Sequence, residues 1–139
     1  MYEISAVKEK LASGKFDPMF AKLYDKKQSY ILEQRQRYGE AVEEFLKIFP
    51  GHEEVSLFSA PGRTEVGGNH TDHQHGCVLA AAVNLDVIGV VSKNQDNVIR
   101  IQSKGFPIDV IDLADLTPQD PETGHSASII RGIAARFRE

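Results

Sequence analysis

The spacing of apolar residues changes at Pro50-Gly51, and this change constrains the fold more than any other feature of the sequence. Before it, apolar residues recur every three or four positions, which is typical of helices that pack by one face. After it, Val55 and Leu57 alternate with polar residues, which is the period of a β-strand. We therefore expect an α+β protein, with amino-terminal helices followed by a mostly antiparallel sheet and a final helix.

Three helices are expected within residues 1–50. The first has apolar residues at an i, i+3, i+7 spacing and ends at Gly14. The second begins at Asp17-Pro18, because proline fits the first turn of a helix. The third runs from about Gln28 to Pro50-Gly51, which cannot continue a helix. The apolar faces that we expect to pack in the core consist of Ile4, Val7, Leu11, Met19, Phe20, Leu23, Tyr38, Val42, Phe45 and Phe49.

The strands are expected after Gly51. The β-branched and Ala-rich runs Val78–Val83 and Val87–Val91 predict buried strands. Two shorter strands are expected at Val98–Gln102 and Ile108–Ile111. The last segment, from about Ser126, predicts a helix. Its apolar stripe consists of Ile130, Ile133, Ala134 and Phe137.

Composition indicates one globular domain over residues 1–139, with a helical lead-in at 1–50 and a sheet plus helix at 51–139. The net charge is −4 without a Lys/Arg cluster, which argues against a nucleic-acid partner. No stretch approaches the ~20 apolar residues of a membrane span, and no secretory segment opens the chain. The one cysteine, Cys77, fits a reducing cytoplasm and is expected to be a small buried residue.

Polar and special residues concentrate between Ala60 and Gly76. These seventeen residues hold three of the five histidines, four of the eleven glycines and the cation of Arg63. A loop that joins two strands is a common place for function, because a rigid scaffold positions it. The run Asn69-His70-Thr71-Asp72 offers dense hydrogen-bond donors and acceptors for a polyhydroxylated ligand. Arg63 adds a fixed positive charge suited to a phosphoryl group.

One residue inside the apolar run has a different interpretation. Asp86 lies between the two predicted strand runs, and we interpret it as a structural hydrogen-bonding group rather than an acid–base catalyst.

The segment resembles the galactokinase signature of the GHMP small-molecule kinases. The family pattern is A-P-G-R-x-N-L-I-G-E-H-T-D-Y-x-x-G, and the string in this chain is A-P-G-R-T-E-V-G-G-N-H-T-D-H-Q-H-G. The chain departs from the pattern at Glu65, Asn69 and His73, which stand where the family has Asn, Glu and Tyr. The later strands resemble the layout of the family's amino-terminal domain, a ribosomal protein S5 domain 2-like fold.

The resemblance implies an ATP-dependent phosphorylation of the anomeric hydroxyl of galactose, giving galactose 1-phosphate. Arg63 matches the family residue that stabilises charge on the transferred phosphoryl group. His70 and Asp72 match residues that hydrogen-bond the sugar, and Thr71 lies in the same segment. Asn69 stands at a sugar-binding position, where its amide still hydrogen-bonds a hydroxyl.

The parts of the family that handle ATP have no counterpart in this sequence. It contains neither G-x-x-x-x-G-K-[ST] nor G-x-G-x-x-G, and it lacks the family's Gly-rich loop that runs into Ser-Ser-Ser-Ala. The family's catalytic Asp base follows that loop. We therefore expect an amino-terminal fragment of a two-domain kinase, inactive alone, with ATP and Mg²⁺ bound elsewhere in the intact enzyme. Such a fragment would expose apolar surface, which favours self-association.

Two alternatives remain open. His70, Asp72 and His73 form part of a hydrolytic metal pattern, although Gly68 stands where that pattern needs its first histidine. Tight zinc uptake by the purified chain that is abolished by His70→Ala would support that alternative. The second alternative is a non-catalytic sugar-binding module that uses the same residues as the kinase.

Overall fold

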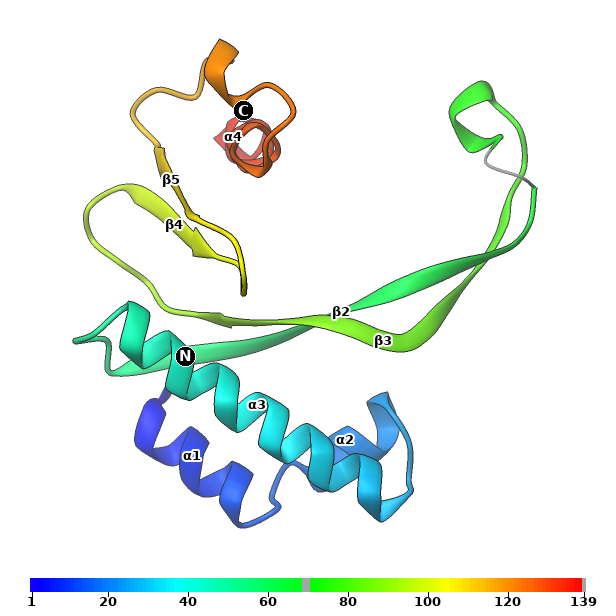
Figure 1. Ribbon diagram of the computed structural model, residues 1–139, viewed down its shortest axis with the longest axis vertical. Coiled ribbons are helices and arrows are strands. Elements are labelled where there is room, and N and C mark those ends of the chain that lie inside the picture. Colours follow the sequence, from blue (N-terminus) through cyan, green and yellow to red (C-terminus); the bar gives the residue numbers. More distant parts are fainter. Residues whose placement is uncertain (69–70, 139) are drawn as a thin grey trace. The chain divides into compact units, whose positions relative to one another are not determined.

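The computed structural model describes residues 1–68 and 71–138, with the backbone alone at Asp72. Three helices, then antiparallel strands, then a final helix follow one another as the sequence predicts, which confirms the α+β class (Figure 1). A short strand before the first helix was not predicted. The chain divides into two compact units, Met1–Ser92 and Lys93–Glu139. The prediction of one domain over residues 1–139 stays a prediction.

The first unit contains the three expected helices, α1 (Ile4–Ala12), α2 (Asp17–Leu23) and α3 (Gln28–Ile48). Local chemistry sets their ends. Gly14 follows α1 with a φ of 76°, a left-handed conformation that glycine adopts without strain. Pro18 lies in the first turn of α2, where its missing N–H costs no hydrogen bond.

The core of the first unit is formed by part of the predicted apolar faces of these helices. The prediction that Met19 and Leu23 pack in the core was wrong, because they are 40% and 46% exposed. Phe20 and Val42 are completely buried, and the rings of Phe20 and Tyr38 lie 5.1 Å apart between centroids. Val55 of the neighbouring sheet is also completely buried and closes the core. The full cluster of buried apolar residues is Ile4, Val7, Leu11, Phe20, Tyr38, Val42 and Val55.

A long antiparallel hairpin completes the first unit. Strand β2 (Glu54–Gly67) pairs with β3 (Leu79–Val91), and the short β1 (Tyr2–Glu3) pairs with the start of β2. Helix α3 contacts β3. The end of the hairpin that carries residues 67–79 extends past the three helices (Figure 1).

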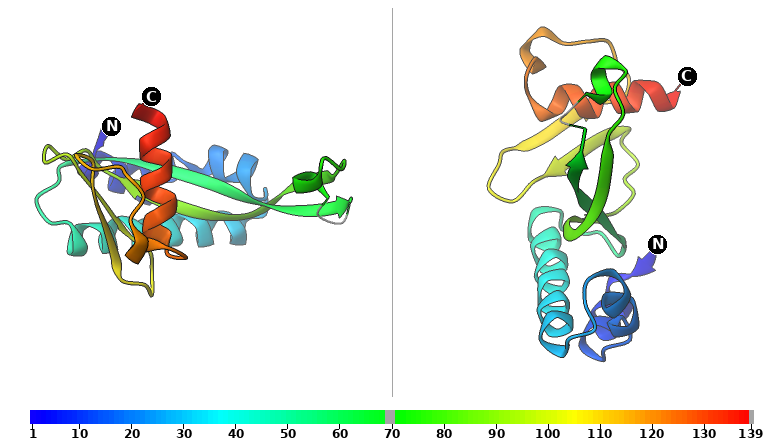
Figure 2. Two further views of the ribbon diagram at one scale, coloured as in Figure 1. Left: turned by 90° about the horizontal axis from the view of Figure 1, so that it is seen from above. Right: turned by 90° about the vertical axis from the view of Figure 1, so that its right-hand side faces the viewer.

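The prediction of strands within residues 78–91 is confirmed by β3, but the prediction that they are buried was wrong for much of the strand. The structure has one strand there, and Leu79, Leu85 and Val87 are 65%, 75% and 76% exposed. The helices of the unit lie beside only part of the two-stranded hairpin, so much of its apolar surface has no cover within the described residues. Figure 2 shows the hairpin continuing beyond them.

The second unit contains a hairpin and a helix, as predicted. Strands β4 (Val98–Gln102) and β5 (Ile108–Asp112) pair antiparallel, and α4 (Ser126–Arg138) contacts β5. Only part of the predicted apolar stripe of α4 is buried. Ile130 and Ala134 are half-buried, whereas Ile133 and Phe137 are 54% and 89% exposed.

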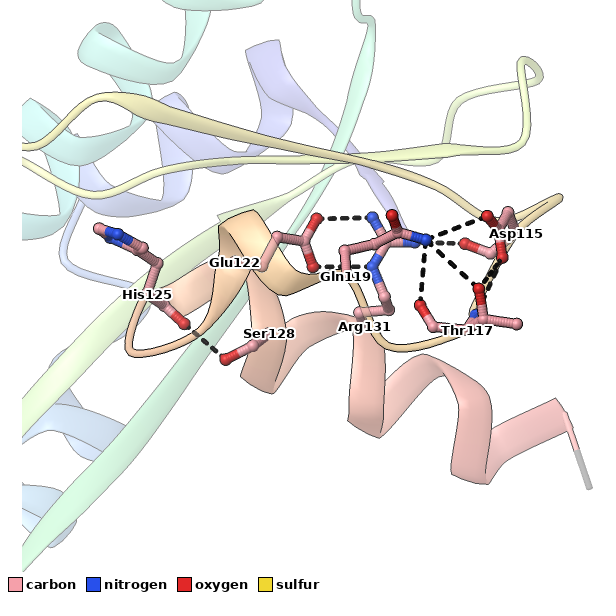
Figure 3. Close-up of polar contacts among 7 residues, drawn as sticks. All are labelled: Asp115, Thr117, Gln119, Glu122, His125, Ser128 and Arg131. Carbon is pink, nitrogen blue, oxygen red and sulfur yellow. Dashed lines mark hydrogen bonds and ion pairs between the residues drawn. The ribbon is translucent and has the colours of Figure 1, made fainter.

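Arg131 of α4 holds the connection between β5 and α4 in place (Figure 3). Its guanidinium is buried and donates two hydrogen bonds, of 2.7 and 2.6 Å, to the carboxylate of Glu122. A third hydrogen bond from Arg131 reaches the carbonyl oxygen of Asp115. The hydrogen bonds from Arg131 lower the pKa of Glu122 below its ordinary value. The acidic connection is therefore tied to the helix by a bidentate ion pair.

None of the helices in the described part of the chain is long and apolar enough to cross a membrane.

Candidate functional site

The chemistry-bearing segment lies at the far end of the β2–β3 hairpin. Residues 60–67 form the latter part of β2. The described part of the loop that follows consists of Gly68 and residues 71–78, and it includes the short helix η1 (Asp72–Gln74). Since antiparallel pairing holds both ends of the loop, the sheet fixes the place where the loop begins and ends. The predicted position of this segment between two strands is confirmed for Gly68 and residues 71–76, but it was wrong for residues 60–67, which belong to β2.

Thr71 organises the described part of the loop. Its hydroxyl donates to the carbonyl oxygen of Gly68 at 2.8 Å, and its own carbonyl accepts from the backbone N–H groups of Gln74 and Gly76 at 3.0 and 2.7 Å. A Cβ on Gly76 would overlap the Thr71 side chain. Glycine is therefore required at position 76 for the loop to close on Thr71.

Gly68 is the second glycine that the loop geometry requires. Its φ is 114°, and a Cβ there would lie 2.6 Å from the carbonyl oxygen of Cys77 and from the Cα of Val78. These contacts bring the two ends of the loop against each other. Gly68 and Gly76 thus serve the loop's own closure.

Arg63 lies on β2, opposite Ala82 of β3, and its side chain is exposed. Within the described residues, its guanidinium has no hydrogen-bond or ion-pair partner. The three residues of β3 opposite positions 63–65 are all alanines, which leave room above the strand. A guanidinium in this position can form two parallel hydrogen bonds to a phosphoryl or carboxylate group.

The other predicted site residues are placed less completely. Asn69 and His70 lie outside the described residues, and of Asp72 only the backbone is described, in η1. The grouping of these three with Arg63 and Thr71 therefore stays a prediction. Among the described residues, no group of three or more His, Cys, Asp or Glu side chains is placed to hold a metal ion. Because His70 and the side chain of Asp72 are not among them, the metal alternative stays a hypothesis.

The prediction that Cys77 is buried was wrong. Its side chain is exposed, because β3 begins only at Leu79 and Cys77 still belongs to the loop.

A buried carboxylate supports the strand that carries Arg63. The Asp86 side chain on β3 is only 3% exposed. It accepts hydrogen bonds from Arg37 of α3 at 2.5 Å, from the Tyr24 hydroxyl at 2.6 Å and from the Ser59 hydroxyl of β2. Arg37 also donates to the Asp86 carbonyl oxygen at 2.7 Å. We call Tyr24, Arg37, Ser59 and Asp86 the Asp86 cluster. The interpretation of Asp86 as a structural hydrogen-bonding group is confirmed.

The cluster keeps Asp86 ionised. Burial raises the pKa of the Asp86 carboxyl, but the hydrogen bonds from Ser59, Tyr24 and Arg37 outweigh burial and hold its pKa below the ordinary value. Burial, together with the hydrogen bond to Asp86, raises the pKa of the Tyr24 hydroxyl well above its ordinary value. Tyr24 therefore acts as a hydrogen-bond donor to a fixed negative charge at every physiological pH.

Sequence reasoning found Asp86 but not its partners. Tyr24 and Arg37 lie 62 and 49 positions away in the chain, and no local spacing connects them to Asp86. The available signal was an acid in an apolar strand, which must find donors if it is buried.

A cavity of about 330 Å³ adjoins the Asp86 cluster. Its lining is largely apolar and includes Leu23, Phe58, Pro61 and Val83. Arg63 and Thr71 do not line it. This cavity therefore lies beside Ser59 and Pro61 of β2 rather than at the loop.

Residues 43–93 match the family described as the galactokinase galactose-binding signature. This match extends from the second half of α3 through the whole β2–β3 hairpin. Residues 43–93 of the chain are similar to the galactokinases. The resemblance inferred from the A-P-G-R and G-N-H-T-D residues is thereby confirmed.

Individual galactokinases are similar to this chain over part of its length. That of Lactococcus lactis subsp. cremoris is 31% identical over 97 residues, which cover 68% of this chain and 24% of the relative. That of Clostridium tetani is 36% identical over 79 residues, covering 56% and 20%. That of Dictyostelium discoideum is 41% identical over 63 residues, covering 45% and 13%. The chain thus spans a quarter or less of the length of these curated relatives. No solved structure matches it.

Gly76→Ala is expected to disturb the loop, because the added methyl group overlaps Thr71. Overpacking of this kind costs about 1–3 kcal/mol, and faster amide hydrogen exchange at residues 71–76 would report it. Gly132→Ala is the matched control, since nothing lies within 4 Å of its Cβ and alanine favours a helix. Equal exchange rates at residues 71–76 in both variants would contradict the assignment.

Asp86→Asn is expected to lower the unfolding free energy by about 1–3 kcal/mol at neutral pH. A carboxyl whose pKa is depressed by folding stabilises the protein above its unfolded-state pKa, and that contribution is lost as the pH falls through the folded-state pKa. The difference between wild type and variant should therefore be full above about pH 4 and shrink at lower pH. Urea unfolding over this range measures it. A difference that stays constant down to about pH 2 would contradict an ionised Asp86.

Proposed function

We propose that this chain is the galactose-binding part of a galactokinase, an enzyme that transfers the γ-phosphoryl group of ATP to the anomeric hydroxyl of galactose. The observation that carries the proposal is the galactose-binding signature over residues 43–93, which coincides with the hairpin and its loop. The exposed guanidinium of Arg63, four residues before the end of β2 at Gly67, supports it.

We assign the site residues by their positions in the motif. Asn69, His70, Thr71 and Asp72 hydrogen-bond the sugar hydroxyls and orient the anomeric oxygen for attack. The Thr71 hydroxyl already donates to Gly68, so in this assignment its oxygen accepts from a sugar hydroxyl. Arg63 stabilises the negative charge that gathers on the phosphoryl oxygens in the transition state.

The remaining assignments follow the resemblance. ATP and Mg²⁺ bind in other parts of the intact enzyme, and the fold is that of the GHMP amino-terminal domain, which the α+β order of elements supports. A cytoplasmic location, a tendency to self-associate and the absence of nucleic-acid and membrane partners belong to the same proposal.

The chain alone is expected to bind galactose without turning it over, because the ATP loop and the catalytic base lie outside it. A coupled assay for ADP in the presence of galactose and Mg-ATP tests this expectation. Steady ADP release that depends on galactose would contradict it.

Substitutions of Arg63 and Asp72 are expected to have different effects on catalysis and on galactose binding. Asp72→Ala should abolish galactose binding by the chain in calorimetry, because a carboxylate that accepts from two hydroxyls is lost. Arg63→Ala should change sugar affinity little but lower kcat of the intact enzyme by about 100-fold or more. Arg63→Lys is the matched control for charge, and partial activity is expected, since it loses the two-pronged contact. Unaltered galactose binding by Asp72→Ala, or equal losses of kcat and affinity in Arg63→Ala, would contradict the assigned roles.

A further inference from the structure

The pairing of β2 with β3 is interrupted just before Arg63. Pro61 pairs with Asp86 and Arg63 pairs with Ala82. Between these two pairs, β2 contributes one residue, Gly62, whereas β3 contributes Val83, Asn84 and Leu85. The two extra residues of β3 form a bulge, which interrupts the pairing and bends the strand locally.

Gly62 lets this bulge fold toward β2. A Cβ at position 62 would lie 3.2 Å from the carbonyl oxygen of Leu85 and 3.3 Å from a methyl group of Val83. The bulge is therefore packed tightly against the backbone of the A-P-G-R segment. Arg63 is the first paired residue beyond it.

The Asp86 cluster lies at the base of the same bulge. Asp86 directly follows Leu85 and forms the last regular pair before the bulge, with Pro61. Its carboxylate is tied to β2 through Ser59 and to the helical layer through Tyr24 and Arg37. Arg37 also holds the Asp86 backbone by its carbonyl oxygen. The strand consequently cannot slide at this point without breaking a buried ion pair.

We propose that the Asp86 cluster positions Arg63, by fixing the bulge at residues 83–85 and hence the pairing of Arg63 with Ala82. Asp86, Ser59, Tyr24 and Arg37 are positioning residues in this proposal, since they act on Arg63 through the backbone. The inference rests on the proposed function for its consequence in phosphoryl transfer, but the effect of the Asp86 cluster on the pairing of Arg63 does not depend on that function.

A purely stabilising role of the Asp86 cluster is the alternative, and it predicts a different experimental result. If the cluster only stabilises the unit, any variant of equal instability should have the same effect on Arg63. The pair formed by Arg35 and Asp17 provides the matched control. It is also an Arg–Asp ion pair between α2 and α3, each side chain is about a quarter exposed, and neither residue touches β2 in any described hydrogen bond.

The experiment compares Ser59→Ala, Asp86→Asn and Asp17→Asn in the full 139-residue chain by NMR, with galactose as the probe. Ser59→Ala and Asp86→Asn should shift the amide signals of Gly62, Arg63 and Thr64 and weaken the cross-strand contact between Arg63 and Ala82. They should also lower kcat of the intact enzyme on the order of tenfold, because a displaced Arg63 stabilises the phosphoryl charge less well. Asp17→Asn should change neither the amide signals nor the functional measurement, although urea unfolding should show that it is less stable than wild type.

Two results would overturn the inference. One is an unchanged set of Gly62–Thr64 signals in folded Asp86→Asn and Ser59→Ala; the other is an equal change in Asp17→Asn. Failure of the proposed function gives a different result, because the wild-type chain would then not bind galactose while the amide signals still report the positioning. Should Asp86→Asn not fold, Ser59→Ala decides alone, since it removes only the tie between Asp86 and β2.

Discussion

The hydrogen bonds to the buried carboxylate of Asp86 are the interactions on which the first unit depends most. An ionised group that is 3% exposed is costly unless donors surround it. Here a guanidinium and two hydroxyls surround it, and they come from α3, the end of α2 and β2. One charge therefore joins the helical layer to both strands of the hairpin. Apolar packing around Phe20 and Val42 supplies the bulk of the burial, but it is non-directional and does not specify strand register.

This division of roles explains how a long hairpin can present a defined site at its far end. Near the helices, the hairpin is held by Val55 in the core and by Asp86 in its polar cluster. Beyond Pro61 the pairing continues without cover from helices, and the loop closes through Thr71, Gly68 and Gly76. The galactokinase galactose-binding signature spans these same elements. The conformation of the site thus depends on glycine geometry and on backbone pairing more than on a surrounding core.

Much of the fold could be predicted from the sequence because its signals are local. Pro18, Gly14 and Pro50-Gly51 limit the helices, and the spacing of Ile4, Val7 and Leu11 identifies a buried face. The burial of residues 78–91 could not be predicted this way. An apolar run shows what a strand could bury, and only the tertiary arrangement determines whether a second layer covers it.

The candidate site was predictable to a similar extent. A dense polar loop with four glycines pointed to residues 60–76, and the structure explains the glycines at 68 and 76 by contacts within the loop. The partners of Asp86 were not predictable, because Arg37 and Tyr24 reach it only after the helices pack on the hairpin. Charge pairs so distant in sequence leave no periodic signal.

The most direct test of the central claim is amide hydrogen exchange of the chain with and without saturating galactose. Binding by the β2–β3 loop predicts that protection from galactose is confined to residues 60–78, and that glucitol, which lacks the sugar ring, gives none. Protection that appears only in other segments, or no protection at any galactose concentration, would contradict the assignment of this loop as the sugar site.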